Sequence, residues 1–188
     1  MRLPRFPRVI GFDDAPFARR AGSAVQLAGV VCAGTRFEGL VWGRVRRDGW
    51  NSTREVCRLL EGGKFLPQLH LVLLDGIAFG GFNVVDLPEL AARLRKPCVA
   101  VMRRPPDLDA VERALRRLPR ADERWARLRG AGDIHQLGGF TFQVQGAEPS
   151  FVADALALVT DKGRVPEALR LAHLIGSAVI TGESSQRA

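Results

Sequence analysis

The sequence predicts an α/β fold built on one mixed sheet, with antiparallel and parallel strands in the same layer and helices on both faces. Two observations support this prediction. Three consecutive apolar, valine-rich segments open the chain, and helical and extended patterns alternate after them. A meander followed by alternating helix and strand is typical of a mixed sheet. An ordinary doubly wound sheet with an extra hairpin is the alternative.

Length and composition favour a single domain over residues 1–188. Hydrophobic residues make up 46% of the chain, which is enough for one full core, and no apolar run approaches the ~18 residues needed to cross a membrane. The basic N-terminus meets Pro and Asp before a signal-peptide core can form, so we expect a cytoplasmic protein. Cys32, Cys57 and Cys98 are scattered and odd in number, which fits neither a disulfide framework nor a Cys-based zinc site.

A strong positive charge favours phosphate-bearing partners. The chain has 28 Lys+Arg against 20 Asp+Glu, for a net charge of +8, and nearly all of its basic residues are Arg. Such a field favours nucleic acid, and a solvated Arg-rich surface is the alternative. No P-loop or nucleophile-elbow motif is present, and the His residues are far apart in sequence. These absences argue against P-loop hydrolysis, serine-based acyl transfer and a zinc site.

Three strands are expected first. Residues 8–14 form a short apolar run that ends in two acids. Segments 24–34 and 37–47 flank a Gly-Thr-Arg turn, which is a hairpin signal. We therefore expect an antiparallel meander at the start of the chain.

A helix and a buried strand follow. Ser52 and Glu55 have the spacing of a capping box, which predicts a helix over about 53–61 that ends before two glycines. The near-continuous apolar run 69–75 is typical of a parallel strand that is buried on both faces.

The second half of the chain alternates helices and strands. Asp86 and Asp107 are placed to cap helices, and Pro166 suits the first position of the last helix. The expected helices are 87–95, 108–118, 121–129, 149–159 and 166–180, and the expected strands are 97–102 and 140–145. This element order is that of a ribonuclease H-like sheet.

Acidic residues fall where two of these strands end. Asp13 belongs to the pair that closes the first strand, and Asp75 closes the fourth strand before a glycine. Sites in open α/β sheets form at the carboxyl ends of strands, and we expect these two strands to pair side by side. Two neighbouring carboxylates repel each other unless a cation joins them, and Mg²⁺ prefers such oxygen ligands. The pair therefore predicts a divalent-metal site, with a strand-end cap or a β-turn as the alternative.

Other candidate residues have equally good structural explanations. Glu55 completes the capping box, and Asp48 lies in an Asp-Gly turn. His173 is flanked by apolar residues on the last helix, where a histidine with a satisfied hydrogen bond is common.

Three long segments resemble the endonuclease dU family. They are VIGFDDAPF, LVLLDGIAFGGFNVVDLPELAARLRKPCVAVMRR and VPEALRLAHLIGSAVITGESSQRA, and the resemblance covers nearly the whole chain. The same segments are more distantly similar to endonuclease V, a ribonuclease H-like nuclease that nicks beside deaminated bases. The resemblance implies a ribonuclease H-like fold and a Mg²⁺- or Mn²⁺-dependent nuclease.

The resemblance also implies roles for particular residues. V-I-G-F-D places Asp13, and L-L-D-G places Asp75, at the metal carboxylates of the family. Glu55 has the spacing of a third carboxylate, about twenty residues before the second Asp. The closing V-P-E-A-L-R-L-A-H places His173 near the metal, and A-V-M-R places Arg103 at the phosphate-contacting cation.

The chain departs from endonuclease V at several positions. Endonuclease V inserts a Pro-Tyr-Ile-Pro wedge, whereas this chain has no Tyr, so Trp50 is the nearest aromatic candidate, with a packing role as the alternative. Asn51 stands where close relatives have Asp, and Asp48 is the alternative to Glu55 as a metal ligand. In place of a His-Pro-Arg motif, four residues are expected to line a pocket for an extruded base: Phe79, Gly80, Gly81 and Phe82.

The expected activity is metal-dependent nicking of nucleic acid, with DNA favoured over RNA, at or near deoxyuridine or hypoxanthine. The missing wedge and Asn51 favour one alternative, a catalytically weak or inactive module of the same fold that grips nucleic acid through Arg. A phosphoesterase that acts on free nucleotides is a third candidate.

Overall fold

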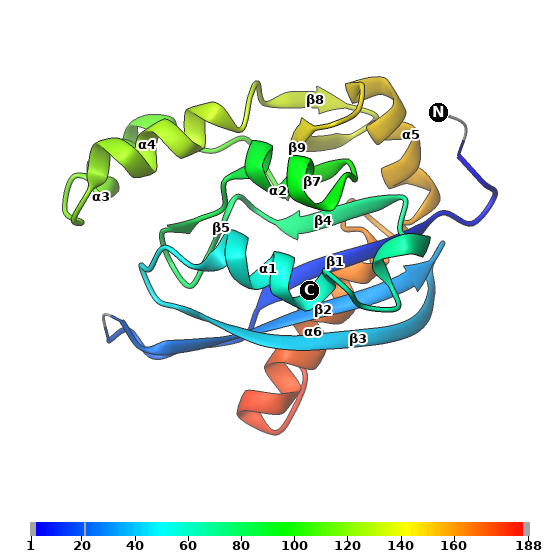
Figure 1. The fold of residues 1–188 in the computed structure, drawn as a ribbon, viewed down its shortest axis with the longest axis horizontal. Helices are drawn as coiled ribbons and strands as arrows, with labels where there is room; N and C mark the ends of the chain where they lie inside the picture. Colours follow the sequence, from blue (N-terminus) through cyan, green and yellow to red (C-terminus); the bar gives the residue numbers. More distant parts are fainter. Residues whose placement is uncertain (1–2, 21, 186–188) are drawn as a thin grey trace.

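The structure is a computed structural model that describes residues 3–20 and 22–185. Its main layer in these residues is a seven-stranded sheet in the order β3-β2-β1-β4-β7-β9-β8 (Figure 1). The strands are β1 Arg8–Asp14, β2 Ala24–Ala33, β3 Arg36–Arg46, β4 Leu71–Asp75, β7 Cys98–Met102, β8 His135–Leu137 and β9 Phe140–Gln145. β4 is parallel to β1 and to β7, and the other neighbours are antiparallel, which confirms the predicted mixed sheet.

Helices cover both faces of this sheet, as predicted. The α-helices are α1 Ser52–Leu60, α2 Leu87–Leu94, α3 Leu108–Leu115, α4 Ala121–Gly130, α5 Pro149–Leu158 and α6 Glu167–Thr181. α1 and α2 pack on one face, and α5 and α6 pack on the other (Figure 1). A short 3₁₀ turn, η1 Leu66–Gln68, precedes β4, and a small hairpin of β5 Ala78–Phe79 and β6 Asn83–Val84 follows it. No helix within the described ranges combines the length and apolar character that a bilayer crossing requires.

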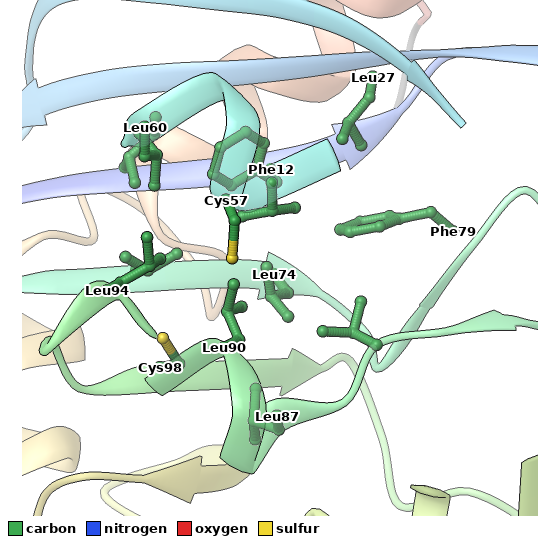
Figure 2. Packing of buried hydrophobic residues seen from close by; sticks show 14 of the residues in the cluster. Phe12, Leu27, Cys57, Leu60, Leu74, Phe79, Leu87, Leu90, Leu94 and Cys98 are labelled. Carbon is green, nitrogen blue, oxygen red and sulfur yellow. The ribbon is translucent and has the colours of Figure 1, made fainter. Parts of the chain in front are cut away.

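Two apolar clusters fill the spaces between the sheet and its helices. Successive side chains of a strand face opposite sides, so each central strand serves both clusters. Phe12 and Leu74 pack with Leu60 on the side of α1 and α2 (Figure 2). Leu73 packs with Leu156 on the side of α5 and α6. The central strands are therefore held on both faces.

Close backbone contact sets the depth at which α6 lies on the sheet. A Cβ atom at Gly11 of β1 would lie 2.7 Å from the carbonyl carbon of Ala168 and from the backbone nitrogen of Leu169. At the other end, a Cβ atom at Gly176 would lie 3.3 Å from the Cα of Ala15. Two glycines thus allow the backbones of α6 and the β1 segment to approach closely.

The start of α1 differs from the prediction. The helix begins at Ser52, its N-cap residue Asn51 makes no side-chain capping hydrogen bond, and the Ser52 backbone N–H donates to Asn83 Oδ1 at 3.1 Å. The predicted capping box between Ser52 and Glu55 is therefore wrong, because the Glu55 carboxylate accepts hydrogen bonds from the Arg44 backbone N–H and from Arg58 instead. Pro166 likewise forms the N-cap of α6 rather than its first turn.

We predict that Gly11→Ala lowers the free energy of unfolding by about 1–3 kcal/mol, because the new methyl group meets the α6 backbone. Gly130→Ala is the matched control, because a Cβ atom there meets nothing within 4 Å. Urea titration measures both variants. Equal stability of Gly11→Ala and the wild type would contradict the conclusion that the α6 backbone packs directly against Gly11.

Candidate metal centre

Three separate elements bring one cluster of donor atoms together. Phe12 of β1 pairs in parallel with Leu74 of β4, so the next residues, Asp13 and Asp75, lie side by side at the carboxyl ends of the two strands. α6 adds His173, whose Nδ1 lies 2.8 Å from Asp13 Oδ2. One ligand atom from each of the two aspartates and from the histidine lies within 4.8 Å of the other two.

Burial and mutual repulsion make these carboxylates costly to ionise. The Asp13 side chain is only 6% exposed, and its burial, together with the charges of Asp75 and Asp14, raises its pKa to about 7. The hydrogen bond from His173 opposes this rise. Burial also raises the pKa of Asp75, against the opposing charge of Arg103, whose Nη2 lies 4.0 Å from Asp75 Oδ2. A cation at this cluster would relieve the repulsion.

The donor set fits a small divalent cation. Carboxylate oxygens are the ligands that Mg²⁺ and Mn²⁺ prefer, and two aspartates leave further coordination positions for water or phosphate. The Nδ1 contact with Asp13 holds the His173 ring in place and leaves Nε2 available to an ion, a water or a substrate.

A cleft of about 630 Å³ opens beside this cluster. Arg103 and Arg104 add positive charge to its wall, so the structure places Arg103 next to the predicted metal carboxylates. Phe17, which follows β1 and is 36% exposed, adds an aromatic ring. The cleft is lined by Asp13, Asp14, Ala15, Pro16, Phe17, Asp75, Gly76, Val101, Met102, Arg103, Arg104 and His173.

The structure does not bring Glu55 into this cluster. Glu55 Oε1 accepts a hydrogen bond from the backbone N–H of Arg44 at 3.0 Å, and Arg58 pairs with the same carboxylate at 2.7 Å. The hydrogen bond from Arg58 holds the pKa of Glu55 below its ordinary value. Glu55 therefore fixes α1 to the edge strand β3, and it does not lie beside Asp13 and Asp75 as the predicted third carboxylate requires.

Asp48 also lies outside the cluster and organises two loops. Its backbone adopts a positive φ of 52°, and its backbone N–H donates to Gly80 O at 2.8 Å. Asp48 Oδ1 accepts a hydrogen bond from Phe82 N at 2.9 Å. Gly81 has a positive φ of 85°, and a Cβ atom there would lie 2.5 Å from the same oxygen, so any other residue would be strained at this position.

The structure does not bring the expected base-pocket residues, Phe79, Gly80, Gly81 and Phe82, to the metal cluster. Phe79 is completely buried in the cluster between the sheet, α1 and α2 (Figure 2). Gly80 is buried too, and its N–H donates to Asp14 Oδ2. None of the four lines the cleft beside the metal cluster. The hairpin thus contacts the acidic strand end through a main-chain N–H, which binds Asp14.

Trp50 is held by the protein's own cations. The guanidinium carbons of Arg120, Arg124 and Arg127 lie 4.0, 4.5 and 4.7 Å from its ring centroid. This geometry matches the packing alternative for Trp50, because the ring anchors the loop before α1 to α4.

The sequence analysis named neither Asp14, Phe17 nor Arg104 as a residue of the cleft, and it missed one buried cation. Asp14 had a signal, since it adjoins Asp13, and Phe17 had one in the stretch that follows the two acids. Arg124 had none, because its role depends on distant segments. It is 2% exposed and donates to the carbonyls of Asp48, Gly49, Pro119 and Phe82.

Comparison with known proteins gives a family match over most of the chain. The family model for endonuclease dU matches residues 5–180. A UPF0215 protein of Deinococcus radiodurans is 43% identical over 97% of this chain and 93% of its own length. A crystal structure of an Archaeoglobus fulgidus protein superimposes with a TM-score of 0.88 at 33% identity, covering 94% of this chain and 99% of that one.

More distant solved structures share the fold. Endonuclease V of Bacillus subtilis has a TM-score of 0.61 at 13% identity, covering 93% of this chain and 81% of that one. Endonuclease V of Ciona intestinalis, solved with a DNA 24-mer that contains inosine, has a TM-score of 0.54 at 15% identity, covering 89% and 83%. The mixed sheet with helices on both faces is thus the ribonuclease H-like fold, as predicted.

We predict that Asp13→Asn stabilises the metal-free protein at pH 8 and that this gain shrinks towards pH 4. The folded-state pKa of Asp13, about 7, lies above the ordinary Asp value near 4, so the folded protein holds a proton that the unfolded chain releases. The wild type therefore loses stability as the pH rises from about 4 to 7, and Asn removes that loss.

Urea unfolding in EDTA across this pH range measures the effect, with exposed Asp109→Asn on α3 as the control. Parallel pH profiles for Asp13→Asn and the wild type would show that Asp13 carries no such cost.

Proposed function

This chain belongs to the endonuclease dU family, and we propose that it is a divalent-metal-dependent endonuclease that nicks nucleic acid, with DNA as the favoured substrate, at or near a deaminated base. The observation that carries the proposal is the convergence of Asp13, Asp75 and His173 within 4.8 Å at the carboxyl ends of adjacent strands. The family match and the fold shared with endonuclease V support a nuclease.

Asp13 and Asp75 would hold the ion, with His173 beside it. A bound Mg²⁺ or Mn²⁺ would polarise the scissile phosphate and lower the pKa of an attacking water. His173 would hold Asp13 through Nδ1 and present Nε2 to a water or a leaving oxygen. Arg103, whose side chain is 51% exposed, has the reach and charge to contact a phosphate in the cleft.

The cleft also suits an unstacked base. Phe17 supplies the phenyl ring among the described lining residues, and it makes no ring or guanidinium contact with the rest of residues 3–20 and 22–185. The chain just before Phe17 is fixed, because Ala15 N donates to Gln26 O at 2.9 Å and the Pro16 ring restricts its own backbone angle. A nucleobase that leaves its stack would find a ring there.

A catalytically inactive nucleic-acid-binding module is the second candidate, and Asn51 favours it. Asn51 Oδ1 accepts hydrogen bonds from Arg46 N at 3.0 Å and from Asn83 Nδ2 at 2.9 Å. The residue therefore holds the loop before α1 in place, and as a neutral amide it does not attract a metal ion as an aspartate would. Binding of nucleic acid without cleavage under any divalent metal would select this candidate.

We predict that Asp75→Asn lowers Mg²⁺-dependent nicking of uracil- or hypoxanthine-containing DNA by roughly 100-fold or more, because it removes a metal carboxylate. Gel analysis of end-labelled duplex and single-stranded substrates measures the loss. Asp109→Asn is the control. Thermal unfolding verifies that Asp75→Asn folds, and wild-type nicking rates in a folded variant would overturn the assignment.

We predict that Phe17→Ala weakens binding of uracil-containing single-stranded DNA by roughly 5- to 100-fold, because each stacked base contributes about 1–3 kcal/mol. Phe17→Trp should retain the affinity. Phe37→Ala, on β3 and 48% exposed, is the matched control. Fluorescence anisotropy in EDTA measures binding without cleavage, and unchanged affinity for Phe17→Ala would show that the ring does not contact the base.

A further inference from the structure

A second large hollow lies where the end of β3 faces α1. It measures about 910 Å³, and we call it the arginine hollow because four arginines line it. They are Arg44 and Arg46 from β3, and Arg54 and Arg58 from α1. The neighbouring Trp42 is fixed, because its Nε1 donates to Gln26 Oε1 at 3.0 Å.

Most of this positive charge has no partner in the fold. Arg58 pairs with Glu55 at 2.7 Å, and Glu55 is the acid that lines the arginine hollow. Arg44, Arg46 and Arg54 are exposed, and no carboxylate in the described part of the chain lies within 4.0 Å of their guanidinium groups. Like charges gathered around one hollow attract an anion, and several arginines together suit the repeated phosphates of a polymer.

The walls of the arginine hollow are held in place before any ligand arrives. The backbone N–H of Arg44 donates to Glu55 Oε1, and that of Arg46 donates to Asn51 Oδ1, each at 3.0 Å. These bonds use donors of the edge strand that could otherwise pair with another chain. Because these N–H groups are already used, an added β-strand does not fit here. A ligand in the arginine hollow contacts the arginine side chains, which suits a phosphate backbone.

The arginine hollow adjoins the metal cleft. Ala15 lines the cleft, Gln26 lines the hollow, and Ala15 N donates to Gln26 O at 2.9 Å. β2 alone separates β1 from β3, so two strand spacings, about 10 Å, separate their axes. One strand of nucleic acid can therefore reach the metal cleft and the arginines of β3 with phosphates that are only a few nucleotides apart.

We propose that the arginine hollow binds the sugar-phosphate backbone of the substrate strand within a few nucleotides of the metal centre. This inference rests on the proposed function, because it assumes that the scissile phosphate lies at Asp13 and Asp75. It assigns the hollow a positioning role that is independent of base identity.

The test compares two double variants that remove the same charge. Arg46→Ala/Arg54→Ala removes two of the four arginines of the arginine hollow, and Arg113→Ala/Arg117→Ala removes two exposed arginines in and just after α3. Binding of uracil-containing DNA is measured by anisotropy in EDTA over a range of salt. Because the first variant removes two arginine–phosphate pairs, we expect roughly 50-fold weaker binding at 0.1 M salt and a salt slope lower by nearly two, and a much smaller change for the control pair.

A second arm locates the contact. A series of DNA substrates carries one neutral methylphosphonate at each of the few positions next to the uracil in turn. We expect one of these positions to weaken binding by the wild type, and the same substrate to bind Arg46→Ala/Arg54→Ala with little further loss. Equal losses in the two double variants, or no binding by the wild type, would overturn the inference. Wild-type protein that shows this binding pattern but never cuts with Mg²⁺ would uphold the arginine hollow and refute the endonuclease.

Discussion

The parallel pairing of β1 with β4 is the constraint on which the candidate site depends. It sets two aspartates next to each other at strand ends, although they are far apart in the chain. α6 then crosses these strands, and its backbone packs directly against Gly11. This short distance between helix and sheet lets His173 reach Asp13. If α6 packed farther from the sheet, His173 would not lie beside Asp13 and Asp75.

In this arrangement, ionising the aspartates is unfavourable at the site where the chemistry is proposed to occur. Asp13, Asp14 and Asp75 all have raised pKa values because burial disfavours their charged forms. The Gly80 N–H relieves part of that cost at Asp14, and His173 relieves part of it at Asp13. Without a cation the ionised carboxylates would repel one another, and a bound cation would offset the remaining cost. The strands tolerate it because apolar clusters hold them on both faces.

The sequence was informative where local pattern and topology agree. The meander, the buried run before Asp75 and the acids at strand ends predicted the sheet and the Asp13–Asp75 pair, because strand order follows from simple rules. Glu55 was misplaced because spacing along the chain does not show that Arg44 and Arg58 hold its carboxylate. The prediction that Phe79 lines a pocket was wrong for the same reason, because no local pattern shows that its side chain points into the core.

Interactions between distant segments were beyond prediction. Arg124 ties α4 to the loops at Asp48 and Phe82 by donating to their carbonyls, and Trp50 stacks against it. A helical pattern gives no sign that one of several arginines is buried. The short strands β5, β6 and β8 were missed because two or three residues carry no periodicity.

The central claim is that two aspartates from adjacent strands share one divalent ion. Anomalous diffraction from crystals of the protein soaked in Mn²⁺ tests this claim most directly. We expect one strong peak within coordinating distance of carboxylate oxygens from both Asp13 and Asp75, with His173 beside it. A peak bound elsewhere, or none at this cluster at saturating Mn²⁺, would contradict the claim.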